Sequence, residues 1–275
     1  MAASFQIIGL ASGLDSQALI KSLVELKATP NVKRQAEISS LKAKDNALGS
    51  FITKIADLNN SLEKLKSSDL NATKFQTESA ASAELVQDFV DKFNTLVKFI
   101  ANENSLTQVN TSSSSTIVYG SLAKTRIDDD FITQFRSALS SAVADAGSEI
   151  KRISELGIST NRDGTLTFAV DKFKSALAQD GGGVFSVLSN FTNSVTGQSG
   201  IINNYIKYQG VIGQEQTSAN NRINSINKDI ERLNRHLESY QEMLVKQFAN
   251  LENIMGKMQS IGSTLTSYFS SLNKK

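Results

Sequence analysis

The sequence predicts a mainly α-helical protein, in which long terminal helices pack antiparallel as a coiled coil beside a helical body that carries a small β-hairpin. Three observations lead to this fold class. The 275 residues contain one proline, so almost nothing interrupts a helix. Apolar residues recur at alternating steps of three and four between Ile223 and Leu272, which is the heptad pattern of a coiled coil. A shorter repeat of the same kind lies near the amino end.

The composition excludes several classes of function. The chain has no cysteine and one histidine, His236, which excludes thiol nucleophiles, disulfide scaffolds and multi-histidine metal sites. The net charge of +2 comes without a long basic block, which argues against dedicated nucleic-acid binding. No uncharged apolar run approaches the roughly 18 to 20 residues that a membrane span needs. We therefore expect no enzyme, no cofactor, no metal, and neither nucleic acid nor membrane as a partner.

Residues 1–70 predict two helices with a joint at Pro30, because proline disfavours a helix that continues through it. The first helix carries an apolar stripe and begins at an N-cap that is either Ser12 or Asp15. The second helix carries the shorter heptad repeat, which Asp45 and Asn59 interrupt. The sequence leaves two interpretations of these polar residues open. Either they fix the register of the coiled coil, as buried polar residues do, or the helix is slightly rotated there.

The carboxy-terminal repeat is the strongest pattern in the chain, and only Gln247 among its positions is polar. A helix over residues 223–272 would be about 75 Å long at 1.5 Å per residue. Its apolar side chains, once buried, would contribute on the order of 20 to 40 kcal/mol, whereas ordering the helix costs at least as much. This helix must therefore pack on the amino-terminal helices, on other subunits, or on both.

The middle of the chain predicts the helical body. Apolar spacing predicts a helix over residues 84–101 and a Ser-rich loop over residues 102–116. Three aspartates at 128–130 precede a further helix, whose dipole they compensate without a metal. An Asp-Gly pair between two short apolar segments predicts a β-hairpin near residues 153–170. The three glycines at 181–183 predict a flexible turn between two helical segments.

Three parts of the sequence resemble the bacterial flagellar filament cap family, also called flagellar hook-associated protein 2. The amino-terminal part is Gly9-Leu10-Ala11-Ser12-Gly13-Leu14-Asp15, with Leu23-Val24 and Pro30 after it. The carboxy-terminal part is Gln247-Phe248-Ala249-Asn250-Leu251-Glu252, with Met255, Met258, Ser260 and Leu265. The central part consists of Leu156-Gly157-Ile158, Asp163-Gly164-Thr165-Leu166 and Ala176-Leu177-Ala178-Gln179-Asp180. All three occur in the order of the family.

The resemblance implies a structural subunit of the cap at the distal end of the filament, which promotes flagellin folding and insertion during filament elongation. It implies a homo-oligomeric ring, which we expect to be a pentamer. The other implied partners are flagellin, the hook-filament junction proteins and an export chaperone that binds the carboxy end. The implied location is extracellular, at the tip of the flagellum, after export by the flagellar type III apparatus. Residues 1–10 lack the pattern of a cleavable signal peptide, which agrees with uncleaved export.

The resemblance also divides the chain into a leg and a body. Residues 1–30 and 250–275 are expected to form the leg. Its assembly interface would comprise Leu14, Leu19, Leu23, Leu26, Phe248, Leu251, Ile254, Met258, Ile261, Leu265, Tyr268 and Leu272. Residues 31–75 and 84–249 are expected to form the body. The intrachain coiled-coil seam would comprise Leu41, Leu48, Ile52, Ile55, Leu62, Ile226, Ile230, Leu233, Leu237, Tyr240 and Leu244.

The sequence departs from the family at residues 76–83. This short junction stands where family members normally carry large β-rich domains that build the plate of the cap. Either the protein is a natural minimal form or those domains have been removed, and the sequence does not decide between the two. The alternative function is a type III secreted binding module, such as a translocator or an adhesin. A translocator would need an apolar segment that enters a membrane, and the sequence shows none.

Overall fold

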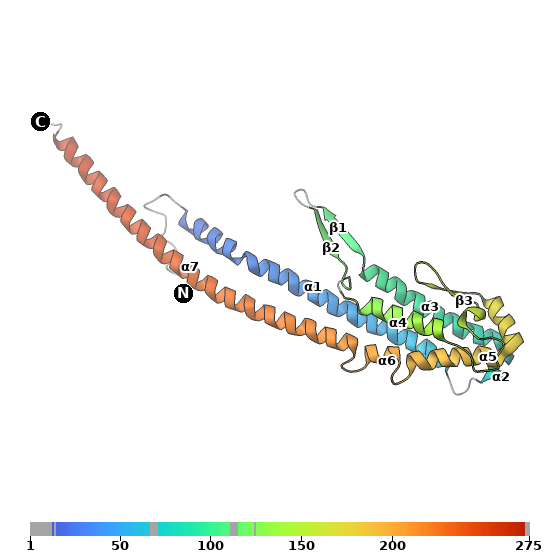
Figure 1. The fold of residues 1–275 in the computed structure, drawn as a ribbon. Coiled ribbons are helices and arrows are strands. Elements are labelled where there is room, and N and C mark those ends of the chain that lie inside the picture. The colour runs from blue at the N-terminus through green and yellow to red at the C-terminus, as the bar shows by residue number, and fades with distance from the viewer. Residues whose placement is uncertain (1–12, 14, 67–70, 111–114, 124, 273–275) are drawn as a thin grey trace. The chain divides into compact units, whose positions relative to one another are not determined.

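The computed structural model describes residues 13, 15–66, 71–110, 115–123 and 125–272, and most of these residues lie in helices (Figure 1). The α-helices are α1 (Ser16–Leu65), α2 (Ala72–Thr77), α3 (Ser79–Glu103), α4 (Ile127–Ser141), α5 (Val170–Thr196), α6 (Ile201–Ile206) and α7 (Val211–Leu272). A 3-10 helix, η1, spans Ile153–Leu156. The strands are β1 (Leu106–Asn110), β2 (Ser115–Tyr119), β3 (Ile158–Thr160) and β4 (Leu166–Phe168). The mainly α-helical fold class is confirmed.

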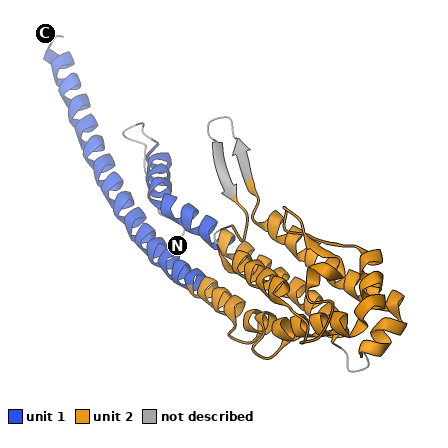
Figure 2. Ribbon diagram, turned by 45° about the vertical axis from the view of Figure 1, so that its right-hand side comes forward, with its two compact units in different colours: residues 1–39, 222–275 blue, residues 40–221 orange. Residues whose placement is uncertain are grey.

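The chain forms two compact units, which Figure 2 distinguishes by colour. The helix-pair unit consists of residues 1–39 and 222–275, and the body unit consists of residues 40–221. Helices α1 and α7 each contribute one part to each unit. The predicted leg and body were divided at residues 30 and 250 on the basis of the resemblance, and that functional division stays a prediction.

Helix α1 runs without interruption through Pro30, so the predicted joint is wrong. A proline in a helix has no N–H to donate to the carbonyl four residues earlier, which here is that of Leu26. The Thr29 hydroxyl donates to this Leu26 carbonyl at 2.8 Å and replaces the missing bond. The helix begins at one of the two predicted caps, since Asp15 Oδ1 accepts the N–H of Ala18 at 2.9 Å. Ser12 lies outside the described residues.

In the helix-pair unit, α1 and α7 lie side by side and antiparallel. The Lys27 ammonium lies 4.0 Å from the centre of the Tyr240 ring. The Asn31 amide donates to Asn234 Oδ1 at 2.8 Å. The third contact is a 2.8 Å ion pair between Glu37 and Arg222. From Lys27 to Glu37 on α1, the contacted residue of α7 shifts from Tyr240 back to Arg222, so the two helices run in opposite directions. The predicted antiparallel packing of the terminal helices is confirmed.

The body unit encloses a core rich in phenylalanine. Phe135 is fully buried, and its ring lies 5.0 Å from that of Phe93 and 5.6 Å from that of Phe191, centre to centre. These rings come from α4, α3 and α5, so the core joins the three longest helices that lie wholly within this unit. The junction at residues 76–83 holds only the end of α2 and the start of α3. Ser82 ties the two helices together by donating to the Phe75 carbonyl at 3.0 Å.

Strands β3 and β4 form the predicted hairpin, with Ile158 opposite Phe168. Gly164 adopts a φ of 84°, which favours glycine, and Asp163 holds the turn. Its Oδ1 accepts the N–H of Thr165 at 3.0 Å and the Thr165 hydroxyl at 2.6 Å. These hydrogen bonds hold the pKa of the Asp163 carboxyl below its usual range.

A second hairpin replaces the loop that the sequence predicted over residues 102–116. Strands β1 and β2 pair antiparallel, from Leu106 opposite Tyr119 to Asn110 opposite Ser115. The serine content of residues 111–115 suggested a loop, but β-branched residues on both sides favour strands. Gly120 is required at the base, because a Cβ there would lie 2.0 Å from the Glu103 carbonyl oxygen.

The three glycines at 181–183 do not form the predicted flexible turn, because α5 continues across them after a kink at Asp180. Asp180 has non-helical angles (φ −151°, ψ 81°) and caps the helical segment that follows. Its Oδ1 accepts the N–H of Gly183 at 2.8 Å, and its Oδ2 accepts those of Glu149 at 2.7 Å and Ile150 at 3.2 Å. Glycine is needed at 183, where a Cβ would lie 2.8 Å from the Ile150 carbonyl oxygen.

Candidate assembly interface

The described part of the chain holds no group of three or more histidine, aspartate or glutamate side chains that could bind a metal ion. None of the helices in that part is long and apolar enough to cross a membrane.

Of the three aspartates at 128–130, Asp128 is buried, which raises its pKa. It accepts hydrogen bonds from the Asn104 amide at 2.5 Å and the Thr125 hydroxyl at 3.2 Å. This aspartate therefore joins the end of α3 to the start of α4.

The last part of α7 displays an apolar stripe to solvent. Ile254, Met258 and Tyr268 are 55%, 66% and 61% exposed, whereas Ile226 on the same helix is 2% exposed. The predicted interface residues on this stripe that are exposed are Leu251, Ile254, Met258, Ile261, Leu265, Tyr268 and Leu272. Phe248 is half-buried. Met255 and Phe269 are exposed next to the stripe, and the strict heptad count missed them.

The exposure follows from the pairing of the two helices. Lys27 lies beside Tyr240, so the same antiparallel register brings Ser16, the first residue of α1, level with the turn of α7 near Leu251. Figure 2 shows α7 continuing beyond the start of α1. Over residues 251–272, about 33 Å of helix, no described segment of α1 lies beside α7.

Helix α1 carries a second exposed apolar stripe. Leu19 is 43% exposed, Leu23 38% and Leu26 73%. Leu14, the other residue predicted for this stripe, lies outside the described residues. The face of α1 that packs in the unit instead contains Ile20 and Ile38, each 3% exposed. The sequence interpretation missed Ile20, although its spacing to Val24 and Ala28 was a signal for a second apolar face.

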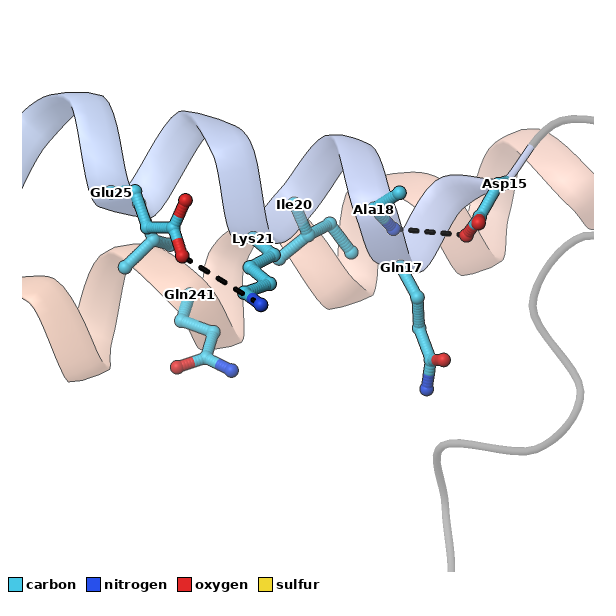
Figure 3. A pocket seen from close by; sticks show the side chains of 8 residues that line it. Asp15, Gln17, Ala18, Ile20, Lys21, Glu25 and Gln241 are labelled. Atoms are coloured by element: carbon cyan, nitrogen blue, oxygen red, sulfur yellow. Dashed lines mark hydrogen bonds and ion pairs between the residues drawn. The ribbon is translucent and has the colours of Figure 1, made fainter.

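A groove lies between the start of α1 and α7 (Figure 3). Its volume is about 530 Å³, and its lining consists of Asp15, Gln17, Ala18, Ile20, Lys21, Val24, Glu25 and Gln241. The apolar part comes from Ile20 and Val24. Glu25 pairs with Lys21 at 3.8 Å, and both side chains are well exposed, so this pair is weak. The groove thus holds two carboxylates and the ammonium of Lys21, and its apolar surface is small because Ile20 is 3% exposed.

The residues of the predicted intrachain seam fall into both units. In the body unit, Leu48, Ile55 and Leu62 are fully buried in the core, and Leu41 and Ile52 are half-buried. In the helix-pair unit, Ile226, Leu237 and Leu244 are buried, and Ile230, Leu233 and Tyr240 are half-buried. The side-chain interactions of Lys27, Asn31 and Glu37 join α1 to α7 in this unit, and all three residues precede the predicted stretch. The assignment of these residues as one seam stays a prediction.

The sequence is similar to known proteins over most of its length. A sequence profile described as "Flagellar hook-associated protein 2 C-terminus" matches residues 50–260. The B-type flagellar hook-associated protein 2 of Pseudomonas aeruginosa is 26% identical over 195 residues, which cover 71% of this chain and 40% of that protein. The flagellar hook-associated protein 2 of Escherichia coli O157:H7 is 25% identical over 193 residues, which cover 67% and 40% of the two chains.

The chain spans about two fifths of the length of these two relatives. Among solved structures, the D1-D2-D3 domains of the flagellar cap protein FliD from Escherichia coli match 51% of this chain and 37% of that chain. The TM-score of this match is 0.39 and the sequence identity is 19%.

Proposed function

The chain belongs to the flagellar hook-associated protein 2 family, and on that basis we propose that it is a structural subunit of the cap at the distal end of the bacterial flagellar filament. In this role it promotes the folding and insertion of flagellin as the filament grows. It acts by assembly and not by covalent chemistry, so we propose no catalytic residue and no cofactor. The resemblance stated from the sequence is confirmed by the family match.

One observation carries the proposal beyond family membership, namely the two exposed apolar stripes of the helix-pair unit. A monomeric protein seldom leaves a long contiguous apolar surface in water, and such a surface marks an interaction site. The α7 stripe over residues 251–272 and the α1 stripe of Leu19, Leu23 and Leu26 are surfaces of this kind. We propose that they form the assembly interface of the leg, with other copies of the chain and with the end of the filament as partners.

The finer features of the proposal follow the family. The copies form a ring, which we propose to be a pentamer, and the leg meets flagellin and the hook-filament junction proteins. An export chaperone binds the carboxy-terminal helix before the chain leaves the cell through the flagellar type III apparatus. Residues 1–30 and 250–275 act as the leg, residues 31–75 and 84–249 act as the body, and residues 76–83 replace the plate domains.

The test places charges on the α7 stripe of the full chain. The double variant Ile261→Asp/Leu265→Asp puts two carboxylates into the proposed interface, and Gln259→Asp/Ser263→Asp puts the same charge on the polar side of the same helix. We expect the stripe variant to stay monomeric in sedimentation velocity and to fail to restore swimming in a strain that lacks its own cap protein. The control variant should assemble and restore swimming. Swimming restored equally by both variants would contradict the proposed interface.

A further inference from the structure

Strands β1 and β2 form a sheet of only two strands, and no other described strand pairs with the outer edge of either one. Figure 1 shows the two strands following the end of α3 in the body unit. A two-stranded hairpin by itself has marginal stability in water, and its edges present backbone groups to which a further strand can bind. This hairpin is therefore a candidate interaction surface.

The two edges lack the residues that usually protect a sheet from further pairing. Natural edge strands carry charged side chains, especially lysine, or proline, which prevent another strand from adding. Residues 104–123 contain no charged residue and no proline. At the base of the hairpin, Leu106 and Tyr119 lie opposite each other and are 62% and 51% exposed. An uncharged edge of this kind favours binding by strand addition.

The hydrogen bonds at the base of the hairpin determine which backbone groups face outward. The N–H of Gly120 donates to the Ser105 carbonyl at 3.0 Å, and the N–H of Leu122 donates to the Glu103 carbonyl at 3.1 Å. Opposite residues of an antiparallel pair alternate between those that exchange hydrogen bonds and those that do not. The residues whose N–H and C=O groups face the outer edges are therefore Leu106, Gln108 and Asn110 on β1, and Ser115, Ile117 and Tyr119 on β2.

From these two edges we infer that the outer edge of β2 in one copy of the chain pairs antiparallel with the outer edge of β1 in a second copy. The two strands already pair over five residues within one chain, from Leu106 opposite Tyr119 to Asn110 opposite Ser115. In this same register, the outward groups of β2 meet the outward groups of the neighbouring β1. The occupant is a second copy because the pairing between copies repeats a pairing that the hairpin itself contains.

The exposed residues at the base of the hairpin agree with this register. Residues directly opposite each other lie on the same face of a sheet. Leu106 of one copy then lies between Tyr119 of its own chain and Tyr119 of the neighbouring copy. The contact thus removes apolar surface of both residues from water, which adds to the backbone hydrogen bonds.

The contact joins two different edges, so it is a head-to-tail contact. Each pair of copies leaves one β1 edge and one β2 edge open, and further copies can add until a ring closes. The inference rests on the proposed function in one respect, namely that copies of the chain assemble. It adds a contact in the body unit, separate from the exposed stripe of α7.

The absence of cysteine allows a direct test by disulfide formation. The full chain is prepared as two single-cysteine variants, Asn110→Cys and isotope-labelled Ser115→Cys, which are mixed and oxidised with copper phenanthroline in air. A disulfide that joins one copy of each variant is necessarily intermolecular, and mass spectrometry identifies it by the label. The control mixture replaces Asn110→Cys with Val109→Cys, which places the thiol on the opposite face of the same strand.

The first mixture should give at least about a fivefold higher yield of the mixed disulfide than the control mixture, because only its thiols lie opposite each other on one face. Equal yields would overturn the inference and would leave these edges to a strand of a different protein.

A second test removes one outward N–H without changing a charge. Gln108→Pro lacks this N–H, whereas Gln108→Ala keeps it. Proline is compatible with the hairpin here, because the N–H of residue 108 faces away from β2 of its own chain. We expect Gln108→Pro to weaken self-association about tenfold in sedimentation velocity and Gln108→Ala to associate like the native chain. Equal association of the two variants would contradict pairing through this edge.

These tests separate the edge contact from the proposed function. If Ile261→Asp/Leu265→Asp abolishes swimming but the mixed disulfide forms no better than in the control, the proposed function stands and the edge contact is removed. If the mixed disulfide forms specifically but the stripe variant swims like its own control, the edge contact stands and the proposed stripe interface is removed.

Discussion

The body unit and the helix-pair unit are built from the same kind of amphipathic helix, but they differ in how far the chain covers its own apolar residues. In the body, Phe89, Phe135 and Phe191 are fully buried because helices α3, α4 and α5 contribute rings to one core. In the helix-pair unit, Ile254 and Met258 on α7 are more than half exposed. The comparison shows that a heptad pattern identifies an apolar stripe without specifying what covers it.

The largest expected effect separates these two kinds of apolar residue. Phe135→Ala should lower the free energy of unfolding by about 3 to 5 kcal/mol, because it removes a buried ring that contacts four others. Leu265→Ala, on the exposed stripe, should change it by less than about 0.5 kcal/mol. Urea denaturation at a concentration where the chain is monomeric measures both. A large loss for Leu265→Ala would show that the free chain already covers the stripe.

An intermediate effect is expected at the kink in α5. Asp180→Ala removes the acceptor of three backbone N–H groups and should cost about 2 kcal/mol at neutral pH. The pKa of Asp180 lies below its ordinary value of 3.8, mainly because the carboxylate accepts the backbone hydrogen bond from Gly183. The stabilisation by the ionised carboxyl is therefore complete above that value and is lost as the pH falls through the lowered pKa of the folded state.

The pH dependence distinguishes Asp180 from a side chain that matters only for packing. The difference in unfolding free energy between the native chain and Asp180→Asn should shrink as the pH is lowered from 6 to 3, because asparagine retains an acceptor oxygen but cannot ionise. Chemical denaturation at a series of pH values measures this difference. A constant difference over that range would show that the charge of Asp180 contributes nothing to the stability of the kink.

The smallest expected effect concerns the continuity of α1. Thr29→Val removes the hydroxyl that bonds the Leu26 carbonyl beside Pro30, and should destabilise the protein by about 1 kcal/mol. Thr53→Val, in the body unit, is the matched control. The Thr53 hydroxyl also bonds a carbonyl, that of Gly49, but this carbonyl already accepts the helical N–H of Thr53. Thermal unfolding followed by circular dichroism compares the two variants, and equal losses would exclude a special role for Thr29.

The candidate interface could be predicted only in part. The leucines of α1 and the apolar residues of α7 were identified from their spacing, and the structure finds the described members of both stripes exposed except Phe248, which is half-buried. The groove was not foreseen, because it depends on which face of α1 turns toward α7.

The sequence by itself determined the features that depend on near neighbours along the chain. These are the amphipathic helices, the cap at Asp15 and the turn at Asp163-Gly164, because helical periodicity, capping and turn geometry act over a few residues. Only the tertiary structure decided the continuity of α1 through Pro30, the pairing of β1 with β2 and the kink at Asp180. It also decided which apolar stripes are covered, because burial depends on side chains that are distant in the sequence.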